Sequence, residues 1–320
     1  LIAGANVTVD SKSAVQNNTS LIAASKKLSV TAVRNIENRY GNNFSSQSGS
    51  DFDITADAGG MVGQEGISLS GQNIYNNSSN IVANNGPLSL IANGVLDNTR
   101  GMLVSGADAI VKAMGVFYNN YATTYSAGNL DITAATLYNF SSGNMSDNTA
   151  TGVIASDKDL TLKVDSSDVN YGWISSKGDL NFSVLKGILY NRNTLSATNA
   201  LTISTLNGVE NFKDIVAGSS LNISTQRHVT NNASANMLAQ NIAIDAGTDI
   251  NNRGNIVADY TLTAKTAGNI YNYLNMLSYG TANCTANSVT NSGTNAVFGG
   301  LTGMEITTGK VTNSGAVIGI

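Results

Sequence analysis

One stretch of the sequence, GNIVADYTLTAKTAGNIYN at residues 254–272, recurs in altered form elsewhere in the chain. Residues 214–231 read DIVAGSSLNISTQRHVTN, and residues 79–98 read SNIVANNGPLSLIANGVLDN. Each copy has an apolar opening that ends in Ala, a short segment of alternating apolar residues, and a closing triplet of the form apolar-x-Asn. Such repetition has to be considered before any other reading, because it determines the whole architecture.

The closing triplet gives the period of the repeat. It ends at Asn17, Asn38, Asn76, Asn98, Asn119, Asn139, Asn191, Asn211, Asn231, Asn252, Asn272, Asn291 and Asn313. From Asn191 onward the steps are 20, 20, 21, 20, 19 and 22 residues. Two longer gaps interrupt the series. We interpret the 38 residues from Asn38 to Asn76 as two turns, and the 52 residues from Asn139 to Asn191 as two turns plus an insertion.

A unit of about 20 residues with three short apolar segments is too short for two helices and fits one turn of a parallel β-helix. Alternation with period two places one set of residues 215–231 on the inward side, namely Ile215, Ala217, Leu221, Ile223, Val229 and Asn231. We predict an all-β fold, a single right-handed parallel β-helix of about 15 coils with loop insertions, since parallel crossovers are right-handed. Residues 1–320 form one segment, with irregular insertions near 39–66 and 140–152 and the most regular repeats at 191–313.

An inward asparagine needs a hydrogen-bonding partner, because an unsatisfied buried amide costs roughly 1–3 kcal/mol. Like residues of successive turns lie about 4.8 Å apart, so each amide can donate to one neighbour and accept from the other. We therefore expect a structural asparagine ladder at the corner of the repeat, clearest at Asn191, Asn211, Asn231, Asn252, Asn272, Asn291 and Asn313. Asparagine also tolerates the left-handed backbone that a corner can require.

The bulk composition excludes several classes of function. Charged residues make up 12% of the chain, about half of the roughly 25% in an average domain. The net charge of -4 provides no basic footprint for nucleic acid. No apolar run approaches the 18 residues of a transmembrane helix. The single cysteine, Cys284, occupies an aliphatic strand position, so we expect a buried thiol. The opening residues, LIAGANVTVD, lack a basic leader and already fit the repeat, so we expect an internal piece of a longer protein.

The stretches LIAGANVTV, DIVAGSSLNIST and GTDINNRGNIVADYTLTAKTAGNIYN resemble the filamentous haemagglutinin repeats of bacterial two-partner-secretion exoproteins. That family includes adhesins and contact-dependent growth inhibition effectors, and the resemblance covers almost the whole chain. It implies a β-helical rod that an outer-membrane transporter exports to the bacterial surface. It also implies an outer-surface receptor on a target cell, either a protein or a glycan such as lipopolysaccharide. Adhesins bind host cells, whereas inhibition effectors bind a neighbouring bacterium and deliver a toxin.

Residues suited to catalysis are few. His228 is the only histidine, and we interpret it as a solvated residue at the start of a strand. Asp51 and Asp53 flank Phe52 and would point outward together, so an acid pair or metal site there is the alternative to a solvated strand face. Asp157 and Asp159 resemble a turn. We expect no cofactor, no metal and no catalysis, with a β-helical carbohydrate-active enzyme as the competing class, which would need convergent carboxylates.

The variable residue of apolar-x-Asn faces outward, because both of its neighbours face inward. That position holds Tyr75, Tyr118, Tyr138, Tyr190 and Tyr271, with Tyr118 and Tyr138 on adjacent turns. Tyrosine suits partner binding, but aromatic residues also favour strands and stabilise ladders, so both readings stay open. Trp173 follows the 140–152 insertion and either packs at a corner or adds to a binding surface.

The sequence thus favours a non-catalytic recognition segment of a secreted β-helical exoprotein. We expect it to bind a receptor on a target cell, with a neighbouring bacterium preferred over a host cell. A purely structural stalk is the main alternative, since repetition alone provides reach.

Overall fold

The computed structural model describes residues 2–40, 59–141, 152–166 and 168–319. Every regular element in these ranges is a β-strand. The strands stack in parallel as a β-solenoid of about 13 turns with a period of about 21 residues. The predicted all-β, parallel β-helical fold is confirmed. Parts of both predicted insertions, residues 41–58 and 142–151, lie outside the described residues, as do Asp51 and Asp53.

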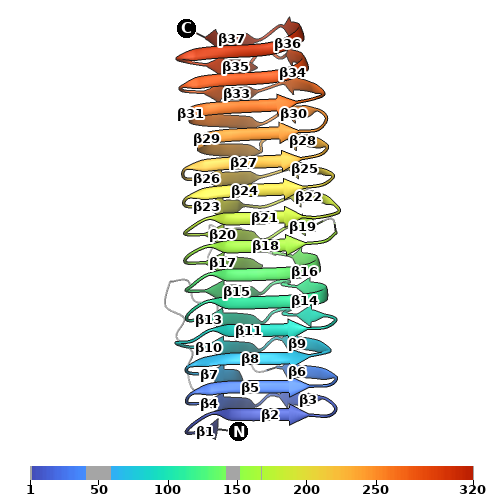
Figure 1. Ribbon diagram of the computed structural model, residues 1–320, viewed down its shortest axis with the longest axis vertical. Helices are drawn as coiled ribbons and strands as arrows, with labels where there is room; N and C mark the ends of the chain where they lie inside the picture. The colour runs from blue at the N-terminus through green and yellow to red at the C-terminus, as the bar shows by residue number, and fades with distance from the viewer. Residues whose placement is uncertain (1, 41–58, 142–151, 167, 320) are drawn as a thin grey trace. The chain divides into compact units, whose positions relative to one another are not determined.

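The chain divides into two compact units, each of which is described by itself. Unit 1 contains residues 1–162 and 171–174, and unit 2 contains residues 163–170 and 175–320. A turn consists of a first, a second and a third strand, and each strand pairs in parallel with its equivalents one turn before and after (Figure 1). Strands β18 (Leu160–Val164) and β20 (Trp173–Ser176) contain residues of both units.

In unit 1 the first strands are β1 (Ile2–Ala3), β4 (Leu21–Ala24), β7 (Gly60–Gly63), β10 (Asn80–Ala83), β13 (Met102–Ser105), β15 (Thr123–Ser126) and β17 (Val153–Ser156). The second strands are β2 (Val7–Ser11), β5 (Lys27–Ala32), β8 (Gly66–Gly71), β11 (Leu88–Ala92) and the first parts of β14 (Ala109–Tyr118) and β16 (Leu130–Asn139). The third strands are β3 (Val15–Asn18), β6 (Asn35–Arg39), β9 (Asn73–Asn77), β12 (Leu96–Asp97) and the last parts of β14 and β16.

In unit 2 the first strands are β23 (Leu195–Ala197), β26 (Asp214–Ala217), the first parts of β29 (Asn236–Ala246) and β31 (Asn255–Thr266), β33 (Asn275–Ser278), β35 (Val297–Gly300) and β37 (Ala316–Gly319). The second strands are β21 (Leu180–Val184), β24 (Ala200–Thr205), β27 (Ser220–Thr225), the last parts of β29 and β31, and the first parts of β34 (Thr281–Asn291) and β36 (Gly303–Asn313). The third strands are β19 (Asp168–Asn170), β22 (Ile188–Asn191), β25 (Gly208–Asn211), β28 (His228–Asn231), β30 (Ile250–Asn252), β32 (Asn269–Asn272) and the last parts of β34 and β36.

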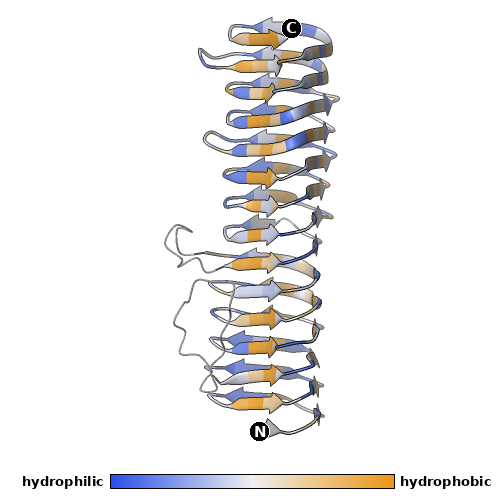
Figure 2. Ribbon diagram, turned by 90° about the vertical axis from the view of Figure 1, so that its left-hand side faces the viewer, coloured by the Kyte–Doolittle hydropathy of each residue, from blue (hydrophilic) through white to orange (hydrophobic). Residues whose placement is uncertain are grey.

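The core of each unit consists of the inward residues of all three strands. The predicted inward set of residues 215–231 is buried throughout, as expected for alternation with period two. Hydrophobic and hydrophilic residues occur within the same strands (Figure 2). Cys284 is among the buried residues, as predicted, and it pairs in register with Ala264 and Ile306. Burial raises the pKa of its thiol to about 12, although a backbone hydrogen bond with Ala264 acts in the opposite direction.

The two long gaps of the repeat differ from each other. Asn38 pairs directly with Asn76, so the 38 residues between them hold one turn, and their division into two turns was wrong. This accounts in part for a total of about 13 turns where about 15 were expected. The second gap does hold two turns, because Asn170 occupies the ladder position of a turn and pairs with Asn191.

The corner after five of the third strands of unit 1 has an unusual backbone conformation. Non-glycine residues with positive φ lie two positions after a ladder asparagine at Thr19, Tyr40, Ser78, Arg100 and Tyr121, with φ between 49° and 58°. The sequence suggested that the ladder asparagine would adopt the left-handed conformation of the corner. The residue that adopts it is instead the one two positions later. The side-chain amide of the asparagine hydrogen-bonds to backbone carbonyls of the corner.

Candidate functional site

Aromatic side chains form a continuous stack on the outward side of unit 1. Tyr118 and Tyr138 are paired in register on β14 and β16. Their ring centroids lie 5.4 Å apart and their planes differ by 11°. The parallel sheet places equivalent residues on top of each other, so two tyrosines at the same outward position stack face to face.

Two further aromatic residues extend this stack. The Phe140 ring lies 6.1 Å from that of Tyr138, and the Tyr171 ring lies 4.8 Å from that of Phe140, with interplanar angles of 23° and 14°. We call Tyr118, Tyr138, Phe140 and Tyr171 the aromatic stack. The side chain of Tyr171 is 37% exposed. Sequence reasoning missed Phe140 and Tyr171, which directly follow ladder asparagines.

The other predicted outward tyrosines do not join this stack. Tyr75 pairs with Glu37 and Asp97 on its neighbouring turns. Tyr190 pairs with Val169 and Glu210. Tyr271 pairs with Asn251 and Thr290. Each of the three is half-buried and stands on a turn whose paired neighbours carry no aromatic ring at that position.

Cation–π contacts replace ring stacking at several outward positions. The Arg39 guanidinium lies 5.1 Å from the ring centroid of Tyr75 in unit 1. In unit 2, Arg192 lies 4.4 Å from the ring of Phe212. A guanidinium over an aromatic face is attracted by the negative potential of the ring. These contacts occupy ring faces that a ligand would otherwise use.

Trp173 lies on β20 and is half-buried. Its backbone N–H donates to the carbonyl of Gly152 at 2.8 Å, and its carbonyl accepts from Asn139 Nδ2 at 3.3 Å. Its indole Nε1 is buried and has no hydrogen-bond partner among the described residues. These backbone bonds hold Trp173 next to the ladder.

The ladder asparagines are hydrogen-bonded to one another inside each unit. In unit 2, Asn231 Nδ2 donates to Asn252 Oδ1 at 2.9 Å and to the carbonyl of Asn255 at 3.0 Å. The same two kinds of bond recur along the ladder of unit 2 at Asn191, Asn211, Asn252, Asn272 and Asn291, and Asn313 accepts from Asn291. Each side-chain amide therefore hydrogen-bonds to the two strands that flank the corner of the next turn.

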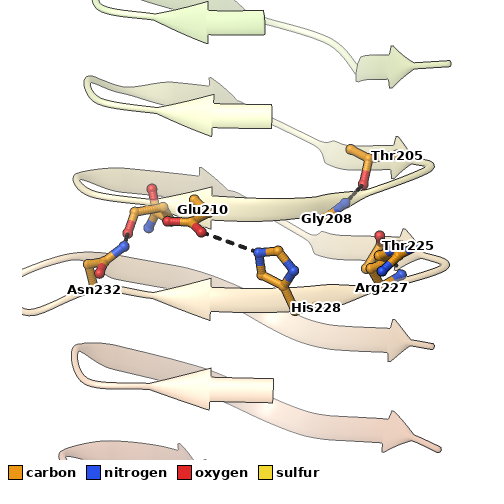
Figure 3. A network of polar contacts seen from close by, with 8 residues as sticks. Thr205, Gly208, Glu210, Thr225, Arg227, His228 and Asn232 are labelled. Atoms are coloured by element: carbon orange, nitrogen blue, oxygen red, sulfur yellow. Dashed lines mark hydrogen bonds and ion pairs between the residues drawn. The ribbon is translucent and has the colours of Figure 1, made fainter. Parts of the chain in front are cut away.

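His228 is not isolated, because its Nε2 lies 3.3 Å from Glu210 Oε1 on the preceding turn (Figure 3). Both side chains are about a quarter exposed. The pair joins β25 and β28 on the outward side of unit 2. One imidazole and one carboxylate form a cross-strand contact, and no second carboxylate of the described residues is bonded to this histidine.

The carboxylates of the described residues do not converge. No group of three or more histidine, cysteine or acidic residues suited to a metal ion occurs there. Two hollows in unit 2 are lined by both polar and apolar residues, and Asp245 is the carboxylate that borders both. Asp157 accepts a 2.9 Å hydrogen bond from the Tyr125 hydroxyl. Burial, this bond and the charge of Asp157 raise the pKa of Tyr125 to about 12.

Comparison with protein families identifies the chain. A family model described as haemagglutinin repeat matches residues 2–51, 45–120, 125–193 and 225–315. The chain therefore belongs to the haemagglutinin repeat family, whose members are typically secreted, surface-exposed exoproteins with structural or adhesive roles. Searches of curated proteins and of solved structures gave no match. No helix in the described ranges is long and apolar enough to cross a membrane.

Proposed function

We propose that this segment of a secreted exoprotein binds a receptor on the surface of a neighbouring bacterium through the aromatic stack of unit 1. The single observation that carries the proposal is the continuous stacking of Tyr118, Tyr138, Phe140 and Tyr171 on an outward side of the solenoid. An adhesin segment that binds host cells is the second candidate, and it uses the same surface.

The geometry of the aromatic stack favours binding for an entropic reason. Tyr138 and Phe140 each lie between two neighbouring rings, and Tyr138 is also held by its strand of the parallel sheet. Side chains that are already fixed lose little rotamer freedom when a partner arrives, and this loss otherwise costs about 0.5–1.5 kcal/mol per side chain. Tyrosine and other aromatic residues are also frequent among the residues that dominate interface energies.

A stalk that only provides reach is the competing function. In that case the rings would act as a ladder that stabilises neighbouring strands. The two functions differ in the effect of removing the rings, because a stabilising ladder changes the free energy of unfolding without changing affinity for a cell.

The test measures saturable binding of the labelled 320-residue chain to whole bacterial cells and to epithelial cells, with unlabelled chain as competitor. We expect competable binding to bacteria that weakens at least ten-fold in the double variant Tyr118→Ser/Tyr138→Ser. The matched control is Tyr190→Ser/Tyr271→Ser, which removes two outward tyrosines that have no ring partner on the paired turns. Absence of binding to both cell types would leave the stalk as the function. Equal affinity of the two variants would show that the aromatic stack is not the binding surface.

A further inference from the structure

A second outward surface, on the first strands of unit 2, carries aliphatic side chains at four successive turns. Val216, Leu238, Val257 and Leu277 are paired in register on β26, β29, β31 and β33. We call these four residues the aliphatic stripe. Leu238 is 37% exposed and the other three are half-buried. Ser196 precedes the stripe and Gly299 follows it in register, so a small polar residue and a glycine bound it.

Polar side chains form a fixed margin beside the stripe. Asn236 Nδ2 donates to Asp214 Oδ1 at 2.7 Å. Asn255 donates to Asn236, and Asn275 donates to Asn255, both at 2.8 Å. Because the side chains of this column bond to one another, they are held in place, and the apolar stripe has a hydrogen-bonded polar column along one edge.

Exposed aromatic residues lie close to the stripe in sequence. Tyr279 follows Leu277 by two residues and lies directly after the end of β33. Tyr260 lies within β31, two residues after Ala258, one turn earlier. Tyr260 and Tyr279 are both more than half exposed. Apolar side chains together with tyrosine are typical of the centre of a protein interface.

The equivalent surface of unit 1 is covered. Val82 and Val104 occupy the same outward position on the first strands β10 and β13, and they are 1% and 7% exposed. Together with Met102 they form a buried cluster against which Tyr125 packs. In this protein, therefore, an outward aliphatic position on the first strands can be part of a buried apolar contact.

Charge and area restrict the partner of the stripe. The four first-strand segments 214–217, 236–239, 255–258 and 275–278 contain one charged residue, the anionic Asp214 in the margin, so the stripe offers no cation to an anionic glycan. Four turns about 4.8 Å apart and four residues of about 3.3 Å each cover roughly 250 Å². A stable dimer buries about 800 Å² per partner. The stripe is therefore too small for a second copy but matches an extended peptide of about six residues, which spans roughly 19 Å.

We propose that the aliphatic stripe of unit 2 binds an extended, uncharged polypeptide segment with apolar side chains. This surface is separate from the aromatic stack and does not depend on the function proposed for it. The partner makes its main contacts with Leu238, Val257 and Leu277, and the asparagine column limits it on one side.

The test selects a phage-displayed heptapeptide library on the purified 320-residue chain, with counter-selection on the Leu238→Ser/Leu277→Ser variant. We expect enriched peptides that are apolar and carry no net charge, with affinity reduced at least ten-fold by the double variant. The matched control, Ile91→Ser/Ile110→Ser, removes two exposed aliphatic residues of unit 1 and is expected to leave peptide affinity unchanged. Urea denaturation verifies that each variant is folded. If the Leu238→Ser/Leu277→Ser variant is not folded, Val257→Thr, which changes side-chain shape least, replaces it.

Three results would overturn the proposal. The first is a failure to enrich any peptide that prefers the wild-type chain over the variant. The second is concentration-dependent dimerisation in light scattering that the Leu238→Ser/Leu277→Ser variant loses, which would assign the stripe to a second copy. The third is binding to lipopolysaccharide vesicles that depends on the stripe, which would assign it to a glycolipid.

Discussion

The outward sides of the first strands differ between the two units although their inward sides are built alike. In unit 1, Val82 and Val104 are buried on their outward side, so both faces of β10 and β13 are covered. In unit 2, Leu238 is exposed and its neighbours in the aliphatic stripe are only half-buried. The repeat thus determines the register and the core, whereas the residues between the inward positions determine what each face contacts.

The largest loss of stability is expected from substitutions in the core, and it should be the same in unit 1 and unit 2. Phe117 in unit 1 and Phe182 in unit 2 are fully buried inward residues. Phe117→Ala and Phe182→Ala should each lower the free energy of unfolding by about 3–5 kcal/mol, the usual cost of a large core cavity. Urea denaturation followed by circular dichroism measures this, with outward Thr202→Ala as the control. A clearly smaller loss in one unit would show that the cores are not equivalent.

The asparagine ladder should give the next largest effect. Asn231→Leu removes the donor to Asn252 Oδ1, where the bond is buried, and to the carbonyl of Asn255, where it is partly buried. Each unsatisfied buried group costs roughly 1–3 kcal/mol, so we expect a loss of about 2–4 kcal/mol. Thr230→Ala, on the outward side of the same strand, should cost under about 0.5 kcal/mol. Similar losses for both variants in urea denaturation would contradict the register of β28.

A smaller loss of stability is expected from substitutions on the outward side of the first strands. Val82→Ala removes two buried methyl groups in unit 1 and should cost about 2 kcal/mol. Val257→Ala, at the equivalent position in the open stripe of unit 2, should cost about 0.5 kcal/mol or less. The same denaturation experiment compares them directly. If the two variants lose equal stability, the faces do not differ in the way that their burial indicates.

The smallest effect concerns the thiol of Cys284 in the core of unit 2. Burial raises its pKa to about 12, so the folded chain keeps the proton that the unfolded chain loses near its ordinary pKa of 9.0. The stability contributed by this group is therefore complete below about pH 9 and is lost as the pH rises toward about 12. We expect Ellman's reagent at pH 8 to react at least 100-fold more slowly with the folded chain than with the chain in guanidinium chloride. Fast reaction of the folded chain would show that this part of the core opens, and Cys284→Ala is the control for both measurements.

Much of the fold could be predicted from the sequence because the period and the alternation report the same geometry. The triplet ending at Asn231 placed the third strand, its inward residues and its outward residue. Asn170 was missed because Asp168 stands where the other triplets have an apolar residue. The gap between Asn38 and Asn76 was divided wrongly because length alone does not distinguish two turns from one turn with inserted residues.

The aromatic stack could be predicted only in part. Tyr118 and Tyr138 occupy the same outward position one period apart, and the period therefore places them side by side. Phe140 and Tyr171 follow the ladder asparagines, where the chain leaves the strand and alternation no longer determines the direction of a side chain. Sequence reasoning did not single out the aliphatic stripe, and its exposure depends on what covers each face, which no periodicity encodes.

Both interruptions of the repeat begin at the same corner, directly after a ladder asparagine and its successor. Asn38 and Asn76 nevertheless remain hydrogen-bonded neighbours at 2.7 Å, and β4 still pairs with β7 across the interruption. The ladder therefore closes each turn locally, without reference to how much chain has been added at the corner. A lineage of such proteins can gain or exchange segments at this point by small genetic insertions, and a protein engineer can graft a foreign loop after Asn252 with the expectation that its bond to Asn272 persists.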